Sequence, residues 1–277
     1  MMSPIVTPKQ VQELRDTGRL VILDASIDFQ IPSTQPNDKH NIIPNAIRFD
    51  YDKVFCDPCS SLPHMMPSEE RFNTLARDIG INQNSIIVIY DNSGTFASPR
   101  AWWMFKALGH TEVYILDGGL TEWKNEGLAT VTSYQNTSSK GNFSGQLQID
   151  YFVDSYFVLN NIDNSSCQIL DARSHDRFNA KVAEPRSGIR SGHIPNSICL
   201  PFMELIDGHK LKSPAELKRI LFNSMDPNKT QYVFSCGSGV TAAIILVAAQ
   251  IAGYQNLSVY DGSWTEWGAN TDLPIQG

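Results

Sequence analysis

The sequence has few cysteines, no long hydrophobic run and no excess of basic residues. Five cysteines in 277 residues are too few for a disulfide scaffold, which excludes the small disulfide-stapled secreted class. The most apolar stretch, residues 242–252, is far shorter than the roughly 20 residues that cross a bilayer. Lys and Arg number 22 against 29 Asp and Glu, a net charge of −7, so we expect neither a nucleic-acid nor a membrane partner.

The composition also excludes disorder, since 42% of the residues are hydrophobic and only 18% are charged. The first six residues have neither the basic flank nor the apolar core of a signal peptide. Together with the odd number of cysteines, this predicts a cytoplasmic protein with reduced thiols.

A repeat is visible in the chain, because three segments of the first half recur about 150 residues later. The pairs are 21–25 with 168–172, 43–46 with 194–197, and 117–123 with 261–267. So long a period indicates a duplicated domain rather than a solenoid. Residues 129–147 are rich in Ser, Thr, Asn and Gln and show no periodicity. We therefore predict two domains, 1–128 and 148–277, joined by a linker over 129–147.

Within each half, short apolar runs alternate with helical patterns. The predicted strands are 20–23, 86–90, 168–170, 232–235 and 257–260. Helices are predicted over 99–108 and 241–252, and a further helix begins after the N-cap Ser213. The alternation predicts an α/β fold in which each half has a mostly parallel sheet flanked by helices.

The segment around Cys236 is the most informative for function. A strand runs into Cys236, Gly237-Ser238-Gly239 follows, and then an apolar helix begins. Ligands bind at the carboxyl ends of strands in such sheets, and a helix N-terminus offers N–H groups that stabilise a thiolate. We therefore predict that Cys236 is a nucleophile rather than a buried structural cysteine.

Residues 236–242 resemble the active-site loop of the mercaptopyruvate sulfurtransferases, in the two-domain rhodanese family. Supporting matches are residues 98–103, 184–188, 192–195 and the tryptophan-containing segment near the C-terminus. The resemblance implies tandem rhodanese-like domains with the active cysteine in the second. Asp91 stands opposite Cys236 in the repeat, and an aspartate cannot carry a persulfide. The first domain is therefore expected to lack a nucleophile.

The resemblance also implies the residues that bind the sulfur donor. Arg177 and Arg186 would hold a carboxylate and a carbonyl, to which a guanidinium offers a rigid fork of donors. Surface exposure is the alternative for both. The loop N–H groups would surround the transferred sulfur; the residues concerned are Gly237, Gly239, Val240 and Thr241.

The family is thought to use a relay of serine, histidine and aspartate. Ser238 and His64 match the first two, and Asp52 is the candidate acid, although the loop between Asp52 and His64 is one residue longer here. The alternative role for His64 is packing between prolines, and the sequence leaves both open.

The resemblance implies transfer of sulfur from 3-mercaptopyruvate through a Cys236 persulfide to cyanide or a thiol acceptor such as thioredoxin, with release of pyruvate. No metal or organic cofactor is expected. Cys56 and Cys59 form a CxxC, but zinc would need a second pair of ligands. Incidental loop cysteines are the default interpretation, and a regulatory disulfide is the alternative.

Three other functions are considered. A thiosulfate sulfurtransferase usually has Arg-Lys where this chain has Gly237-Ser238, and the uncharged pair favours mercaptopyruvate. A cysteine phosphatase needs arginine six residues after its cysteine, where this chain has Ala242. A noncatalytic binding module or sulfur carrier stays open, although the intact Cys236 argues against the former.

Overall fold

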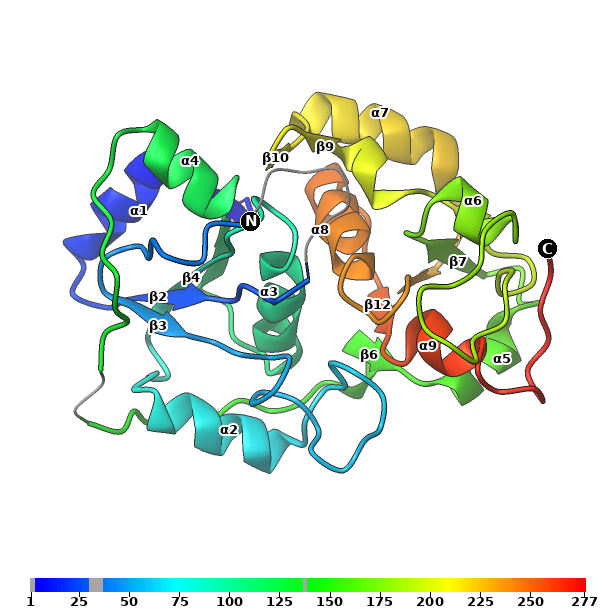
Figure 1. Cartoon of the computed structure of the whole chain (residues 1–277), viewed down its shortest axis with the longest axis horizontal. Helices are drawn as coiled ribbons and strands as arrows, with labels where there is room; N and C mark the ends of the chain where they lie inside the picture. Colours follow the sequence, from blue (N-terminus) through cyan, green and yellow to red (C-terminus); the bar gives the residue numbers. More distant parts are fainter. Residues whose placement is uncertain (1–2, 30–36, 137–138) are drawn as a thin grey trace. The chain divides into compact units, whose positions relative to one another are not determined.

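The computed structural model describes residues 3–29, 37–136 and 139–277, so Met1, Met2 and residues 137–138 of the predicted linker lie outside it. The chain folds as two compact units (Figure 1). The first comprises Met1–Pro58, Met66–Gln148 and Asp207–Leu211, and the second Cys59–Met65, Ile149–Ile206 and Lys212–Gly277.

The first unit contains a five-stranded parallel sheet in the order β1-β5-β4-β2-β3. Its strands are β1 (Ile5–Val6), β2 (Leu20–Asp24), β3 (Ala46–Arg48), β4 (Ile86–Tyr90) and β5 (Val113–Leu116). Every residue of the central β4 is buried, as expected for a strand covered on both faces. The helices of this unit are α1 (Pro8–Arg15), α2 (Glu69–Asp78), α3 (Ser98–Ala107) and α4 (Gly119–Asn125).

The second unit repeats this plan with a parallel sheet in the order β6-β12-β11-β7-β8. Its strands are β6 (Phe152–Val153), β7 (Cys167–Asp171), β8 (Ile198–Cys199), β11 (Gln231–Ser235) and β12 (Leu257–Tyr260). Its helices are α5 (Ser155–Asn161), α6 (His175–Phe178), α7 (Pro214–Ser224), α8 (Ala242–Ala252) and α9 (Ser263–Trp267), with short 3-10 turns at η1 (Ile149–Tyr151) and η2 (Phe202–Leu205). The α/β prediction of tandem, mostly parallel sheets flanked by helices is thereby confirmed.

Local sequence signals account for how these helices begin and end. Ser213 forms the predicted capping box with Glu216 at the start of α7, and Gly253 ends α8 in the left-handed conformation, with φ 100°. Residues 242–249 of α8 are all buried, because this helix packs on β11 and β12 while α7 packs on α8 (Figure 1). An apolar helix of this kind anchors the loop that precedes it.

The division between the units after Gln148 agrees with the predicted start of the second domain at 148, but two short segments group with the unit on the other side of it. Residues Cys59–Met65 group with the second unit, and Asp207–Leu211 group with the first. The latter contain most of a small hairpin, β9 (Ile206–Asp207) and β10 (Lys210–Leu211). Within the first unit, the His209 carbonyl accepts from the Thr95 N–H at 3.0 Å. Composition along the chain does not reveal such exchanges, because they depend on tertiary contacts.

The predicted linker, 129–147, contacts the first unit. It groups with the first unit, and Phe143 within it is fully buried. The N–H groups of Phe143 and Gln146 donate to the carbonyls of Ile81 and Leu108 at 3.1 and 3.0 Å. One buried aromatic side chain and a few backbone bonds suffice to dock a polar segment on a packed domain.

Candidate active site

Cys236 lies where the sequence placed it, between the carboxyl end of β11 and the start of α8. Its residue exposure is 2%, and its Sγ accepts a hydrogen bond from the Gly239 N–H at 3.1 Å. The loop therefore curls back so that a backbone donor points at the sulfur. A donor in this position favours negative charge on sulfur, which suits both a thiolate and a persulfide anion.

The two glycines of the loop serve different steric needs. Gly239 has φ 77°, a conformation that residues with a Cβ rarely adopt. Gly237 lies beside an arginine instead, because a Cβ added there would meet Arg177 Nη2 at 3.4 Å and Nη1 at 3.9 Å. The guanidinium of Arg177 is thus adjacent to the residue that follows the nucleophile.

Helix α9 holds the loop in place through three consecutive residues. Ser263 Oγ accepts from the Cys236 N–H at 3.2 Å, and the Trp264 N–H donates to the Cys236 carbonyl at 3.0 Å. Thr265 donates to the Gly237 carbonyl twice, from its N–H at 2.9 Å and its Oγ1 at 2.6 Å. Ser263 has φ 49°, a strained conformation for a residue other than glycine. The nucleophile is therefore fixed by backbone bonds on both sides.

The two predicted substrate arginines reach this loop from different directions. Arg177 lies on α6, which Ser174 caps, and donates to Glu184 from Nε at 3.2 Å and from Nη2 at 2.5 Å. Arg186 is exposed and donates from Nη1 to Thr265 Oγ1 at 3.0 Å. Because Thr265 and Arg177 both lie against Gly237, the structure brings the two arginines to the loop, and their binding of a donor stays a prediction.

Two neighbouring arginines, Arg173 and Arg190, make structural contacts instead. Arg173 has a side-chain exposure of 1%, pairs with Asp171 at 2.6 Å, and lies 4.2 Å from the centre of the Trp264 ring. Arg190 donates to the carbonyls of Trp267, Gly268, Asn270 and Leu273 and so ties down the C-terminal segment.

The other predicted loop residues lie beside the nucleophile. Ser238 is half-buried, Val240 is buried, and Thr241 is the N-cap of α8. Ser238 is therefore positioned within the loop itself, and its proposed role in moving a proton stays a prediction.

His64 belongs to the same compact unit as Cys236, although it precedes that unit's sheet by some hundred residues of chain. It is 8% exposed and has φ 62°, so its backbone is in the left-handed region. Asp52 is half-buried and groups with the first unit. A relay of Ser238, His64 and Asp52 remains a prediction. His193 bonds the Phe178 carbonyl at 2.8 Å and stacks on the Phe178 ring, so its contacts are structural.

The loop after β4 in the first unit holds a carboxylate where the second unit holds a thiol. Asp91 is fully buried, and its Oδ2 accepts from the N–H groups of Phe96, Ala97 and Ser98 at 3.1, 2.9 and 2.8 Å. The Ser98 hydroxyl adds a fourth bond at 2.7 Å, and Oδ1 accepts from the Ser93 N–H at 2.9 Å. This loop is an anion cradle whose own side chain fills it.

Burial makes three of the remaining cysteines less reactive than a free thiol. Burial raises the pKa of Cys167 to about 11 and that of Cys199 to about 12. Burial also raises the pKa of the Cys56 thiol, whose Sγ is 3.6 Å from the Asp52 carbonyl, and Cys59 is exposed. A regulatory disulfide between the CxxC cysteines stays a prediction. Across the described ranges, no group of three or more His, Cys, Asp or Glu side chains could hold a metal.

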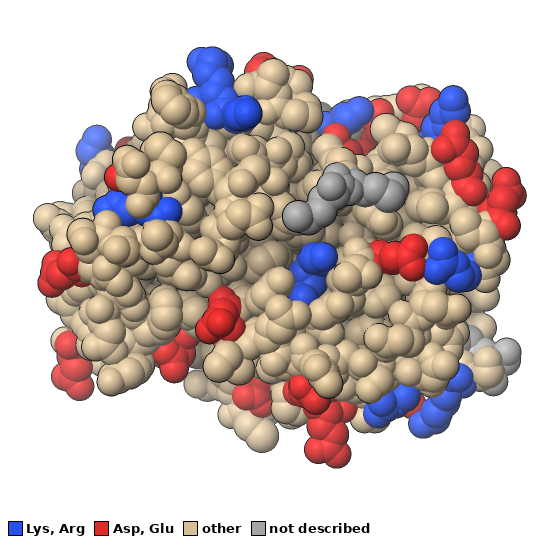
Figure 2. All heavy atoms as spheres, turned by 180° about the vertical axis from the view of Figure 1, so that it is seen from behind, with Lys and Arg blue, Asp and Glu red and all other residues tan. Residues whose placement is uncertain are grey.

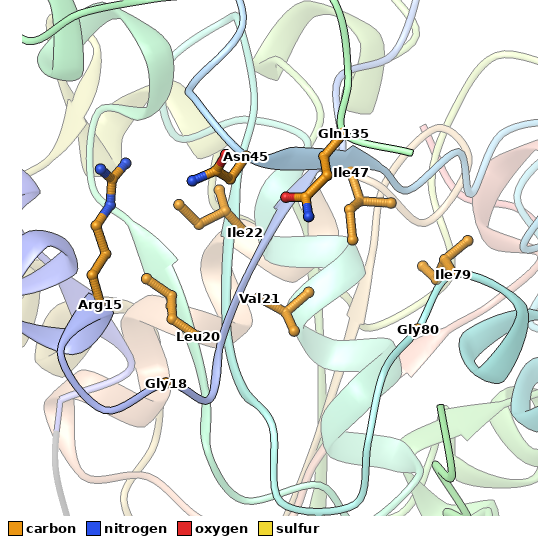
Figure 3. Close-up of a pocket in the computed structure, with 10 residues that line it drawn as sticks. All are labelled: Arg15, Gly18, Leu20, Val21, Ile22, Asn45, Ile47, Ile79, Gly80 and Gln135. Atoms are coloured by element: carbon orange, nitrogen blue, oxygen red, sulfur yellow. The ribbon is translucent and has the colours of Figure 1, made fainter. Parts of the chain in front are cut away.

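A cavity of about 460 Å³ in the first unit is unrelated to these loops (Figure 3). Leu20, Val21 and Ile22 line it at the beginning of β2, with Asn45 and Ile47 beside them. It therefore lies at the amino ends of the strands, whereas the Asp91 loop follows the carboxyl end of β4. Ligand sites of parallel sheets form at the carboxyl ends.

The surface carries charges of both signs. On the face shown in Figure 2, Lys and Arg are scattered among Asp and Glu and form no continuous basic area over the part of the chain that is described. Among the residues that the structure describes, none of the helices has both the length and the apolar character needed to cross a membrane.

Sequence reasoning missed three residues that shape the site, namely Ser263, Thr265 and Glu184. Residues 263 and 265 were visible in the repeated segment 261–267, and Glu184 in the quoted segment 184–188. Nothing in those patterns shows which backbone or guanidinium groups these side chains contact. Their importance follows only from the folded arrangement.

Two sheets of the same strand order, one of which ends in a cysteine-bearing loop, define a tandem-domain α/β protein with one candidate nucleophile. The family model described as "Rhodanese-like domain" matches residues 7–126 and 156–270. The chain therefore belongs to the rhodanese family, as its motifs predicted, and it is an enzyme of the sulfurtransferase class.

Relatives and a solved structure support this assignment. The chain is 39% identical to the 3-mercaptopyruvate sulfurtransferase of Escherichia coli (strain K12), over 84% of this chain and 83% of that protein. It is 37% identical to thiosulfate/3-mercaptopyruvate sulfurtransferase 1, mitochondrial, of Arabidopsis thaliana, over 93% and 74%. The crystal structure of the 3-mercaptopyruvate sulfotransferase SseA from Escherichia coli superposes with a TM-score of 0.82 at 34% identity, over 95% of this chain and 99% of that one.

Proposed function

We propose that the protein transfers sulfur from 3-mercaptopyruvate through a persulfide on Cys236. The observation that carries the proposal is the loop itself. A buried sulfur accepts a backbone N–H at 3.1 Å and is followed by the uncharged pair Gly237-Ser238, and Arg177 lies against Gly237. The names of the relatives in bacteria and plants agree with this donor.

In the first half-reaction the Cys236 thiolate attacks the sulfur of the donor. The new S–S bond forms as the donor's C–S bond breaks, and the electron pair of that bond goes to carbon, which gives the enolate of pyruvate. Protonation of the enolate carbon yields pyruvate, and Ser238 with His64 and Asp52 is the proposed proton route. Arg177 and Arg186 hold the donor's carboxylate and carbonyl, so that its sulfur faces the thiolate.

In the second half-reaction an acceptor thiolate or cyanide attacks the outer sulfur of the persulfide. The S–S bond breaks and the Cys236 thiolate is restored, so neither half-reaction needs an external oxidant or reductant. The N–H groups of Gly239 and its neighbours Gly237, Val240 and Thr241 are proposed to stabilise the persulfide anion before transfer. The two steps predict ping-pong kinetics without a metal or organic cofactor.

We propose a thiol acceptor such as thioredoxin, and a reducing compartment such as the cytoplasm, because the Cys236 thiol must stay reduced between turnovers. The acidic net charge and the mixed surface of Figure 2 support the proposal that neither nucleic acid nor membrane is a partner.

The test is the intact mass of the protein after reaction with 3-mercaptopyruvate in the absence of an acceptor. We expect one added sulfur on Cys236 and about one pyruvate released per chain. Cys236→Ser should lose both, whereas the control Cys199→Ser should keep both. Pyruvate release by Cys236→Ser at the wild-type rate would overturn the proposal.

Thiosulfate is the second candidate donor, favoured by the name of the plant relative. Comparing kcat/KM for the two donors separates them, and a preference for thiosulfate would replace the donor proposed above. A passive sulfur carrier would accept sulfur once but would show no multiple-turnover release of pyruvate.

A further inference from the structure

The buried carboxylate of Glu184 bridges two arginines of different character. Its side chain is 4% exposed. Oε1 accepts from Arg173 Nη1 at 2.9 Å and from Arg177 Nε at 3.2 Å, and Oε2 accepts from Arg177 Nη2 at 2.5 Å. No pattern in the sequence indicates a role for Glu184, and the mechanism above does not use it.

One end of this bridge is immobile. The Arg173 guanidinium donates to both oxygens of Asp171, at 2.6 to 3.1 Å, and to the Gly192 carbonyl at 2.8 Å. It also packs on the ring of Trp264. Since Arg173 is almost fully buried and its charge is matched, Glu184 is held by a fixed partner.

The other end is the arginine of the site. Arg177 uses its Nε–Nη2 edge for Glu184, and within the described residues its Nη1 makes no hydrogen bond. The Nη1–Nη2 edge, which lies against Gly237, is left for an anion. A carboxylate binds such an edge through two parallel hydrogen bonds, and this geometry demands a fixed guanidinium plane.

The same anchor reaches the nucleophile. The N–H of Trp264, whose ring supports Arg173, donates to the Cys236 carbonyl at 3.0 Å. Arg177 and Cys236 are therefore both held by the same rigid group, the packed pair of Arg173 and Trp264. Without Glu184, the long side chain of Arg177 would sample other rotamers, at a cost in entropy when a donor binds.

We propose that Glu184 is a positioning residue, which orients Arg177 to receive the carboxylate of the sulfur donor. The inference rests on the proposed function. The carboxylate of the donor keeps its charge throughout the reaction, so the contact between this carboxylate and Arg177 is equally strong in the ground state and the transition state. Loss of that contact should raise KM and leave kcat little changed.

The test is a double-mutant cycle on the full chain with 3-mercaptopyruvate as the donor. Glu184→Gln keeps the shape of the side chain but removes its charge, and we expect KM to rise about tenfold with kcat within about twofold. In an Arg177→Ala background the same substitution should change KM by less than about twofold, because the residue through which it acts is gone. In the control Arg186→Ala background the tenfold rise should persist, since the side chain of Arg186 hydrogen-bonds Thr265.

An equal rise in KM in all three backgrounds would overturn the inference, as would wild-type KM in Glu184→Gln itself. If Glu184→Gln does not fold, Arg177→Lys provides the second measurement, because lysine keeps the charge but cannot bind Glu184 with two donors. We expect a raised KM and a retained kcat for it, and an unchanged KM would equally overturn the inference. If the wild type releases no pyruvate from 3-mercaptopyruvate, the proposed function fails instead, so the two failures are distinct.

Discussion

Replacement of Asp91 by alanine tests whether the loop after β4 depends on the anion that it encloses. The carboxylate accepts five hydrogen bonds, four at Oδ2 and one at Oδ1, and the residue is fully buried. Alanine would leave these donors without their acceptor. A buried donor left unsatisfied costs about 1–3 kcal/mol, and water entering the vacated space would recover part of this.

Because water recovers part of the cost, we take the low end of this range, about 1 kcal/mol for each donor. With up to five donors affected, Asp91→Ala should lower the free energy of unfolding by about 3–5 kcal/mol. Asp91→Asn is the matched control. Its amide oxygen can occupy the Oδ2 position and keep four bonds, while its NH₂ group faces the Ser93 N–H. The loss should then be about 1–2 kcal/mol.

Urea denaturation measures both variants, and hydrogen exchange locates the effect. Faster exchange is expected in residues 91–107, which include the loop and α3, while residues 232–246 of the second unit should exchange at wild-type rates. A loss below about 1 kcal/mol for Asp91→Ala, or a larger loss for Asp91→Asn, would refute the reasoning.

Three further predictions concern the site and its surroundings. Ser263→Ala removes the acceptor of the Cys236 N–H and keeps the strained φ, so it should destabilise the fold by about 1–2 kcal/mol. Ser263→Gly relieves the strain and should recover about 1 kcal/mol of this loss. Equal Tm values for the two variants would contradict the prediction. The hydrogen bond from Lys210 holds the pKa of Glu122 below its ordinary 4.5, so Glu122 stabilises the fold above pH 4.5 and loses this effect as the pH falls through the lowered pKa. The difference in Tm between wild type and Glu122→Gln should therefore disappear in acid. A difference that stays constant with pH would count against the ion pair. Cys199, with its pKa raised to about 12, should react with iodoacetamide at pH 8 far more slowly than a free cysteine, as peptide mass mapping would show; rapid labelling would contradict its burial.

The two copies of the domain have loops of similar arrangement around different side chains, Asp91 in the first and Cys236 in the second. In both, a strand ends at a residue whose side chain accepts backbone N–H groups from the turn that follows it. A carboxylate in that position is a permanent occupant, while a sulfur can gain and lose a second sulfur atom. The two loops therefore differ in the atom that accepts these bonds, which is a carboxylate oxygen in the first unit and a sulfur in the second.

Local patterns predicted a large part of this structure. The central strands, the helices after them, the capping box at Ser213 and the loop at Cys236 follow from apolar runs, caps and glycines that lie close together in the sequence. Strand β5 (Val113–Leu116) was not predicted, nor were the edge strands β1, β3, β6 and β8 and the hairpin strands β9 and β10, whose two or three residues are too few to show a periodicity.

By itself, the sequence determined the fold class and the duplication, and it identified the candidate nucleophile and the two arginines near it, because each depends on residue types within one short segment. Only the tertiary structure decided that residues 59–65 and 207–211 exchange between units, that Phe143 docks the supposed linker, and that Glu184 joins a buried arginine to one at the site. These features depend on which side chains meet after folding. Partners far apart in the chain, or side chains whose rotamers the packing sets, leave no periodic signal in the sequence.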